Sequence, residues 1–413
     1  VLLVLQYMSC TERNNMSFAA TAGALAISAL LVSPFASVAV HVSAFAPVGT
    51  VRCAPKSFRR YDTSLGPTSL EQEPQPPSQV LAVVAPLKYL GPSNYPALEL
   101  LFPDHQITQD DGSVQQTSLE FIMDTGANIN TVDGAVVDFF DLPVAISAEE
   151  LGAQGLQGAA GMGGTLPICD IHTLGTCKLG GMPPETDFEF MYGLTAAKMP
   201  SLPAGVGNGL LGLTFFMSFP AGVEMDWYGT NGDPPTVIFY YGTETPKESL
   251  ENMVCVPLER LSVGIMALNV NVNGVDMKAI LDTGAPYTIL SPDAAYRAGI
   301  ETYAETMERD DLPLRQQVVG ATGTGIDGGK FKLDRSVSDV SITVGGASLG
   351  ETPVFVGELP GMAVLGELGM ESPPQAILGL DFMQRAYRLV IKISDDSELW
   401  IEELGDQPRW DGQ

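Results

Sequence analysis

The tetrapeptide Asp-Thr-Gly-Ala occurs twice in this chain, at 124–127 and at 282–285. Each copy follows three apolar residues, 121–123 and 279–281, and such a run predicts a buried strand that ends at the Asp. The glycine permits a tight turn and a close approach of another backbone. One such turn arises by chance, but two copies with the same flanks, 158 residues apart (282 − 124), indicate an internal repeat.

The repeated acids, Asp124 and Asp282, predict one site built from two halves of the chain. Two carboxyl groups about 3 Å apart can share a single proton, because both cannot ionise cheaply. One then acts as a general base for a water and the other as a general acid. The hydroxyls of Thr125 and Thr283 can hydrogen-bond across to the opposite loop. This chemistry is suited to cleaving amide bonds without a metal or a covalent intermediate.

The strands expected before each Asp also repeat. In the second half, residues 267–272 alternate in polarity and lead to Asn273-Gly274, which predicts a hairpin returning toward the motif. In the first half, residues 98–102 and 118–121 flank a polar loop in the same way. Both motifs are therefore expected at the end of a hairpin.

Two more features recur after each Asp. About 40 residues on, glycine-rich tips run from 158 to 164 and from 320 to 329. The candidate tip residues are Gly161, Met162, Gly163, Gly323, Thr324 and Gly325. Further along, each half carries an apolar-apolar-Gly-apolar segment that is expected to pack behind the Asp loop. The residues expected to support the loops are Leu211, Gly212, Leu378 and Gly379.

With these motifs the chain resembles the retropepsin-like aspartic proteases, duplicated in one chain as in the two-lobed pepsin-like enzymes. The resemblance covers about residues 80–405. The second half is the closer match, through 282–290 (DTGAPYTIL) and 377–383 (ILGLDFM). In the first half, 124–132 (DTGANINTV) is interpreted as one residue longer before the strand resumes.

The resemblance implies an all-β fold of two pseudo-symmetric lobes with the active site between them. Asp124 and Asp282 would be catalytic, Thr125 and Thr283 an interlocking grip, and the glycine-rich tips flaps over the substrate. The active-site loop residues would be Thr125, Gly126, Ala127, Thr283, Gly284 and Ala285. No Tyr lies between Asp124 and Tyr192, so the pepsin-like flap tyrosine has no candidate in the first flap region. Flaps without it favour the retropepsin branch.

The expected function is that of an aspartic endopeptidase acting on peptide or protein substrates as a monomer, with no cofactor. Both motifs end in Ala, at Ala127 and Ala285. A hydroxyl there could donate a hydrogen bond to the ionised carboxylate and lower its pKa. Without it the dyad should hold its shared proton to higher pH, so we expect activity at mildly acid to near-neutral pH.

The composition narrows the possible binding partners and the fold class. The 413 residues carry a net charge of −28, which disfavours nucleic acid, a polyanion bound through Lys and Arg. Gly and Pro together suit a turn-rich β protein, and helical periodicity is confined to short stretches at 148–151, 194–198 and 293–298.

The cysteines and histidines show no ligand pattern. The five Cys lack regular spacing, so they do not indicate a disulfide framework, although Cys169 and Cys177 could pair across adjoining strands. The three His are far apart, and we expect no metal site. His172 is interpreted as an ordinary flap-strand or surface residue.

The N-terminal region is interpreted as a presequence. Residues 1–44 are assigned to an upstream extension and a signal peptide, because 18–40 is uncharged and rich in small residues. The stretch 42–47 resembles the junction of bipartite presequences in algae with complex plastids of red-algal descent. Residues 45–79 are then a transit-peptide-like segment and a disordered linker. Plastid targeting is expected, with a secretory destination as the alternative and no stable membrane anchor after processing.

Residues 80–247 and 248–413 are expected to form the two lobes. Three alternatives stay open. The fold could serve as a catalytically silent peptide-binding module, in which case Asp124→Asn would keep full function in cells. Each half could instead dimerise with another chain, in which case activity would fall on dilution. The chain could also be a zymogen, inactive until the segment before Val80 is removed.

Overall fold

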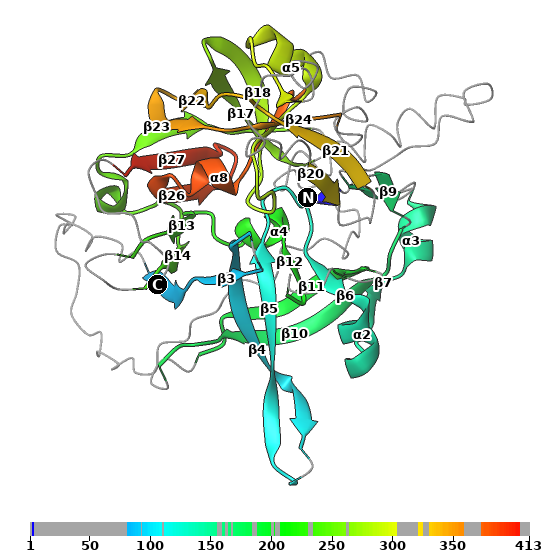
Figure 1. Ribbon diagram of the computed structural model, residues 1–413. Helices are drawn as coiled ribbons and strands as arrows, with labels where there is room; N and C mark the ends of the chain where they lie inside the picture. Colours follow the sequence, from blue (N-terminus) through cyan, green and yellow to red (C-terminus); the bar gives the residue numbers. More distant parts are fainter. Residues whose placement is uncertain are drawn as a thin grey trace, which may run out of the picture.

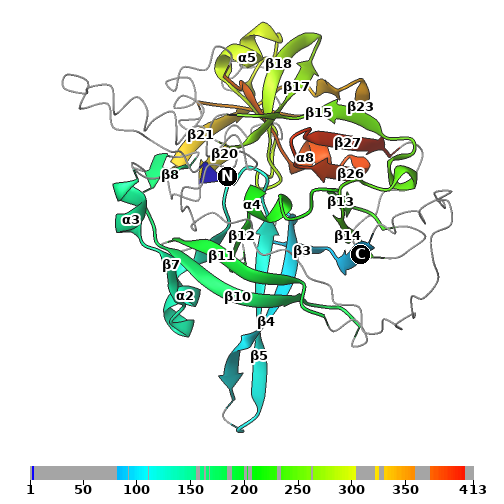
Figure 2. The same cartoon turned by 180° about the vertical axis from the view of Figure 1, so that it is seen from behind.

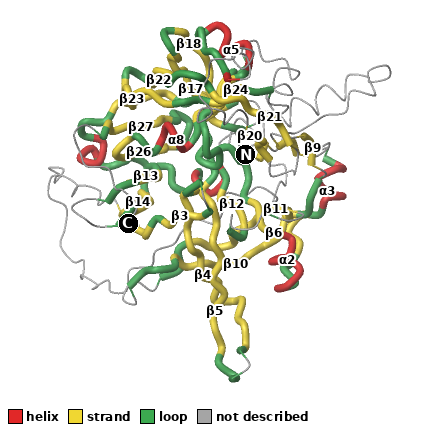
Figure 3. Tube along the Cα trace, viewed as in Figure 1, coloured by secondary structure: helices red, strands yellow, loops and turns green. Residues whose placement is uncertain are grey.

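The computed structural model describes most of the chain beyond residue 80. The described residues are 2–3, 81–91, 93–109, 111–154, 159–161, 164–166, 168–183, 188–199, 202, 207–229, 234–261, 264–303, 321–324, 330–358 and 373–404. Strands dominate them, and the helices are short (Figure 3). The expected all-β class with two lobes is confirmed.

The first half of the chain forms an eight-stranded sheet, coloured cyan to green in Figure 1. Its strands, in spatial order, are β3 (Lys88–Leu90), β4 (Tyr95–Thr108), β5 (Val114–Met123), β12 (Gly209–Leu211), β6 (Thr131–Asp133), β11 (Met191–Met199), β10 (Ile171–Leu179) and β7 (Val144–Ile146). The far ends of β4 and β5 project from the body as a long hairpin (Figures 1 and 2).

The second half forms a ten-stranded sheet in the upper part of Figure 1. Its strands are β20 (Ala321–Thr324), β21 (Lys330–Arg335), β24 (Phe355–Val356), β19 (Ile289–Leu290), β25 (Ala376–Leu378), β18 (Val275–Leu281), β17 (Met266–Val272), β22 (Val340–Val344) and β23 (Ala347–Thr352), with β16 (Glu259–Arg260) beside β17. The expected Asn273-Gly274 hairpin joins β17 to β18. Both of its residues have the positive φ that such a turn requires, 49° and 84°.

A six-stranded sheet combines strands from both halves. The first half supplies β2 (Leu81–Pro86), β14 (Thr236–Tyr241) and β13 (Val223–Asp226), and the second half supplies β26 (Ala386–Lys392), β27 (Glu398–Glu403) and β15 (Val254–Pro257). The expected division between lobes at 247/248 falls at a short 3-10 helix, η4 (Lys247–Leu250), between β14 and β15. A further small sheet contains β1 (Leu2–Leu3), β8 (Ala159–Gly161) and β9 (Gly164–Leu166).

Short helices connect these strands. They are α2 (Gly134–Phe140), α3 (Ala148–Ala153), α4 (Leu213–Phe216), α5 (Pro292–Arg297) and α8 (Leu380–Met383). Two of the three expected helices are present, as α3 and α5, and side chains of Ser147 and Ser291 cap their N-termini. None of the described helices is long and apolar enough to cross a membrane.

The third expected helix, at 194–198, is wrong because these residues belong to β11. Ala and Lys favour helix locally, but β11 pairs with β10 on one side and with β6 on the other. Backbone pairing on both edges outweighs a weak local preference.

The two halves repeat in their strand register. The parallel pairing of β12 with β5 aligns Leu211 with Met123, and that of β25 with β18 aligns Leu378 with Leu281. The interpretation that the first motif is one residue longer is wrong. The strand after each motif resumes seven residues past the Asp, at Thr131 in β6 and at Ile289 in β19.

Candidate active site

The two Asp residues follow directly on the buried strands β5 and β18, as the repeat predicts. The backbone N–H of Asp124 donates to the carbonyl of Leu211 at 2.9 Å, and that of Asp282 donates to the carbonyl of Leu378 at 3.1 Å. The apolar segments named from the sequence therefore lie beside the Asp loops and hold the backbone of each acid.

The glycines of these segments allow the close packing. A Cβ on Gly212 would lie 2.3 Å from the carbonyl oxygen of Ile129, and a Cβ on Gly379 would lie 2.4 Å from the carbonyl carbon and oxygen of Tyr287. Real Cβ atoms do not approach other atoms so closely, so only glycine permits this contact.

The two threonines of the motifs exchange hydrogen bonds between the halves. The Thr125 hydroxyl donates to the Leu281 carbonyl at 2.9 Å, and the Thr283 hydroxyl donates to the Met123 carbonyl at 2.6 Å. Each hydroxyl also accepts the backbone N–H of the other threonine at 3.0 Å. These four bonds lie in the buried interior and fix the two Asp loops against each other.

The two carboxyl groups have matching environments. Oδ1 of Asp124 accepts the N–H of Gly126 at 2.8 Å, and Oδ1 of Asp282 accepts that of Gly284 at 2.8 Å. Each glycine also faces the opposite acid: a Cβ on Gly126 would lie 2.5 Å from Cγ of Asp282, and one on Gly284 would lie 2.4 Å from Cγ of Asp124. The loops thus bring the two acids together from opposite halves.

The electrostatics favour one shared proton. The two Asp residues are at most 1 % exposed. Burial raises the pKa of Asp282 well above its usual range, and the charge of Asp124 and a hydrogen bond with it raise this pKa further, against the opposing effect of the Gly284 N–H. The Oδ2 atom of each Asp is buried and, apart from the opposite acid, has no hydrogen-bond partner among the described protein groups.

A polar residue six positions past each Asp was not identified from the sequence. Asn130 Oδ1 accepts the N–H of Gly212 at 2.9 Å, and Thr288 Oγ1 accepts the N–H of Gly379 at 3.2 Å. The equal spacing from the two Asp residues was the available signal. In the second half Asp381 adds a third member, because its Oδ1 accepts both the N–H and the hydroxyl of Thr288, at 2.8 and 2.7 Å.

Two tyrosines near the dyad were also missed. Tyr95 begins β4, packs on the apolar cluster that includes Ile122 and Ala127, and lies within electrostatic range of both acids. Burial raises its pKa, and the two Asp charges raise it further. Tyr287 is 43 % exposed, and its ring lies 4.7 Å from that of Phe355. Tyr95 was missed because the hairpin expected from residues 98–102 and 118–121 did not extend to it, whereas the observed β4–β5 pairing continues to Ala97 opposite Ile122.

The flap candidates are only partly described. Gly161 closes a hairpin of β8 and β9 by pairing with Gly164, and Gly323 and Thr324 lie in β20, which forms a hairpin with β21. Both hairpins lie on the same side of the molecule (Figures 1 and 2). The other three candidates, Met162, Gly163 and Gly325, lie outside the described residues.

His172 and the two cysteines, Cys169 and Cys177, are structural in their surroundings. His172 is buried in β10, and its Nδ1 lies 2.8 Å from the Leu142 carbonyl oxygen, so the expectation of a flap-strand or surface residue is wrong. The fold buries this position because β10 is an interior strand flanked by β7 and β11. Cys169 and Cys177 are both free thiols, so they do not pair.

The sequence comparison places a known family in the second half. Residues 268–382, which include Asp282, match a family described as aspartyl protease. No curated protein matches the chain significantly.

Three solved structures are remotely similar to this chain. The EIAV protease complexed with the inhibitor HBY-793 is 22 % identical, covering 29 % of this chain and 84 % of its own, with a TM-score of 0.19. A retropepsin-like aspartic protease from Rickettsia conorii is 16 % identical, covering 36 % and 91 %, with a TM-score of 0.22. Basic 7S globulin from soybean is 12 % identical, covering 80 % and 98 %, with a TM-score of 0.42.

These structural likenesses are remote, so the family resemblance rests on the sequence match and on the fold itself. The sequence match supports a general aspartic peptidase function. The chain is similar, through the second of its two Asp-Thr-Gly-Ala halves, to the retropepsin-like aspartic proteases.

Proposed function

We propose that this protein is an aspartic endopeptidase with one intramolecular active site, to which each half contributes one acid, Asp124 and Asp282. The observation that carries the proposal is the mutual approach of Gly126 to the Asp282 carboxyl and of Gly284 to the Asp124 carboxyl. A surface turn would not need such contacts. A protonated and an ionised carboxyl can be held this close because they share the proton.

The proposed reaction uses only these acids and a water. The ionised carboxyl removes a proton from the water as its oxygen attacks the scissile carbonyl carbon, while the protonated carboxyl donates to the carbonyl oxygen. A tetrahedral diol forms. When the C–N bond breaks, the diol loses a proton to a carboxyl and the leaving nitrogen gains one, so the dyad ends as it began. The raised pKa of Asp282 suits it to be the member that holds the proton.

The substrate class we propose is an extended peptide or protein segment. Such a segment would lie between the two lobes and pair its backbone with the hairpins β8–β9 and β20–β21. Tyr95 and Tyr287 would then line the site close to the scissile bond. Because one chain supplies both acids, we propose that the protein acts as a monomer.

The test is cleavage of a peptide library from pH 4 to 8 by the chain from residue 80 onward and by the full chain. Cleavage by the shorter chain that disappears in both Asp124→Asn and Asp282→Asn supports the proposal. Cleavage by the shorter chain alone would add that the preceding segment inhibits. Peptide binding without cleavage by either wild-type form would overturn the proposal in favour of a silent peptide-binding module.

The plastid destination is proposed from sequence alone, because residues 18–47 lie outside the described residues. A fluorescent protein fused after residue 79 tests it in an alga with a complex plastid. Fluorescence inside the plastid supports it, whereas secretion of the fusion would favour the secretory alternative.

A further inference from the structure

The two lobes are joined by one strand pair in the mixed sheet. Strand β13 of the first half runs antiparallel to β26 of the second, with Val223 opposite Ile391 and Asp226 opposite Arg388. Within the part of the chain that the structure describes, no other sheet holds strands from both halves. We call the β13–β26 pair the seam. Its register affects how the two halves are positioned against each other.

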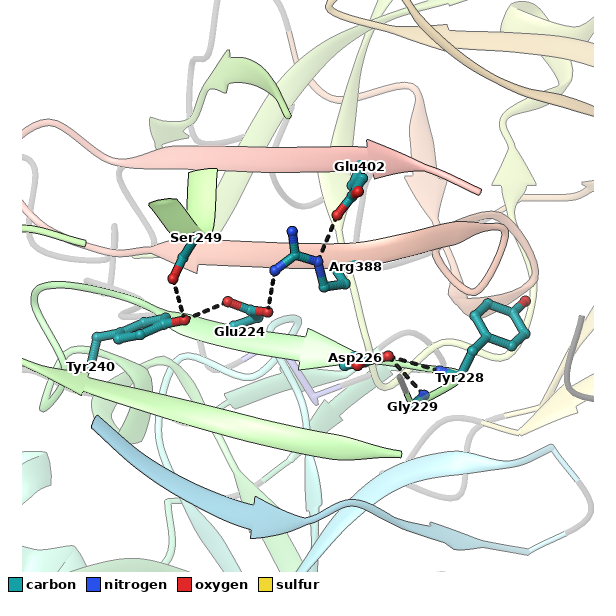
Figure 4. Close-up of polar contacts among 8 residues, drawn as sticks. All are labelled: Glu224, Asp226, Tyr228, Gly229, Tyr240, Ser249, Arg388 and Glu402. Carbon is teal, nitrogen blue, oxygen red and sulfur yellow. Dashed lines mark hydrogen bonds and ion pairs between the residues drawn. The ribbon is translucent and has the colours of Figure 1, made fainter. Parts of the chain in front are cut away.

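A buried ion pair crosses the seam (Figure 4). The Glu224 side chain in β13 is 2 % exposed, and its Oε1 lies 2.9 Å from Nη1 of Arg388 in β26. Arg388 Nε also contacts Glu402 Oε2 in β27 at 2.6 Å, which is a bond within the second half. On the other side, the Tyr240 hydroxyl lies 2.6 Å from Glu224 Oε2 and 3.0 Å from the hydroxyl of Ser249 in the connector between the halves.

The surroundings favour a charged Arg388 and a neutral Tyr240. Burial alone would lower the pKa of Arg388, but Glu224 and Glu402 outweigh it and raise this pKa. Burial raises the pKa of Tyr240, and the Glu224 carboxylate raises it further, so the phenol stays neutral and its O–H donates a hydrogen bond to the carboxylate. The network thus satisfies both oxygens of a carboxylate that water does not reach.

Such a pair contributes specificity more than stability. The cost of removing two charges from water offsets most of their attraction, so a well-packed apolar pair is often as stable. A slip by one residue, however, would turn every side chain of β13 to the opposite face. Glu224 would then lose Arg388 and Tyr240, and a buried charge left unpaired is strongly destabilising. One register is therefore strongly preferred.

The seam strands are tethered closely to the two Asp loops. Helix α4 precedes β13, and its first residue, Leu213, donates its N–H to the Ala127 carbonyl at 2.8 Å. Helix α8 precedes β26 in the same way, and the N–H of Leu380 donates to the Ala285 carbonyl at 2.9 Å. If β13 shifted along β26, one Asp loop would therefore be displaced relative to the other Asp loop.

We propose that the Glu224–Arg388 pair is a positioning device, which fixes the register in which the lobes join and so keeps Asp124 and Asp282 close enough to share a proton. Its kinetic consequences rest on the proposed peptidase function, but its effect on the two carboxyl groups does not. Glu224 and Arg388 act through the backbone and are not catalytic residues.

The test compares the full wild-type chain with Glu224→Met/Arg388→Met, which replaces the pair with apolar side chains of similar length. Carboxyl-carbon NMR of Asp124 and Asp282 reports their titration, and thermal unfolding reports stability. The double variant is expected to melt within a few degrees of the wild type, yet its higher Asp pKa should fall toward an ordinary value. If the wild type cleaves peptides, kcat should fall about 100-fold with little change in KM.

The matched control is Glu402→Gln, which removes a charged partner of the same Arg388 without touching the seam. It should keep the wild-type titration and kcat. If Asp124 and Asp282 titrate in the double variant as they do in the wild type, the proposal is overturned, whether or not the melting temperature of the variant changes. If that variant does not fold, Glu224→Gln/Arg388→Met, which retains a partner for Tyr240, replaces it under the same criterion.

The two proposals fail separately. A wild type that cleaves nothing but shows the shared-proton titration, lost in the double variant, would refute the peptidase function and support the positioning device. If the wild type cleaves peptides and the double variant matches it in Asp titration and kcat, the peptidase function is supported and the positioning device is refuted.

Discussion

Thr125 and Thr283 stand in a reciprocal relationship: each accepts the other's backbone N–H at 3.0 Å, and each donates its hydroxyl to the strand that precedes the other. Neither bond set can form within one half alone. The two Asp residues are therefore held together only when the two halves are joined.

Removing one hydroxyl should loosen the dyad. In Thr125→Val the Leu281 carbonyl and the Thr283 N–H lose their partners, and each buried group left unpaired costs about 1–3 kcal/mol. We expect a lower melting temperature and a large loss of kcat. Thr125→Ser keeps the hydroxyl and should retain most of both. Equal activity in the Val and Ser variants would contradict the role assigned to the grip.

Adding one methyl group between the acids should separate them. In Gly284→Ala the new Cβ would fall 2.4 Å from Cγ of Asp124, so the carboxyl must move. We expect peptide cleavage to drop roughly 100-fold, since displacing reacting groups by about 1 Å has that effect. Gly152→Ala is the control, because its Cβ would meet only Ile168 Cδ1 at an ordinary 3.6 Å. Its cleavage rate should match that of the wild type.

The raised pKa of Asp282 predicts how stability changes with pH. In the pH range between the ordinary Asp pKa of about 3.9 and the raised value, the folded protein binds more protons than the unfolded chain, so stability falls as pH rises. Asp282→Asn removes this titration. Calorimetry should show the variant more stable than the wild type at pH 7, with the difference shrinking toward pH 3. A constant difference across that range would contradict the raised pKa.

The Ala residues that end the motifs predict the pH range of activity. Ala285 is buried directly after the Asp282 loop. A hydroxyl at this position could donate to the ionised carboxylate and lower the pKa of the dyad. We therefore expect the optimum of wild-type cleavage at mildly acid to near-neutral pH, and an acid shift in Ala285→Ser. A wild-type profile that peaks only in strong acid would refute this explanation.

Local sequence patterns were sufficient for the parts of the fold that repeat. The hairpin at Asn273-Gly274, the strands ending at Asp124 and Asp282, and the placement of Leu211 and Leu378 beside them all follow from short-range signals. Each depends on residues adjacent in the chain or on a motif present in both halves.

Features set by tertiary pairing were not accessible in this way. Residues 194–198 have helical composition, yet two neighbouring strands make them β. Tyr95 lies near the dyad because β4 pairs with β5, which ends directly before Asp124, and this pairing extends beyond the residues expected to form it. The Glu224–Arg388 contact joins residues 164 positions apart, and nothing near either residue marks it. Such contacts depend on how sheets assemble rather than on local preference.

The most direct test of the central claim, one dyad per chain with an acid from each half, is complementation between inactive variants. Asp124→Asn and Asp282→Asn would be assayed for peptide cleavage alone, mixed and refolded together, with the wild type followed on dilution. We predict that each variant is inactive alone and mixed, and that wild-type specific activity does not change on dilution. Activity restored by mixing, or wild-type activity lost on dilution, would show that the halves pair between chains and would contradict the account.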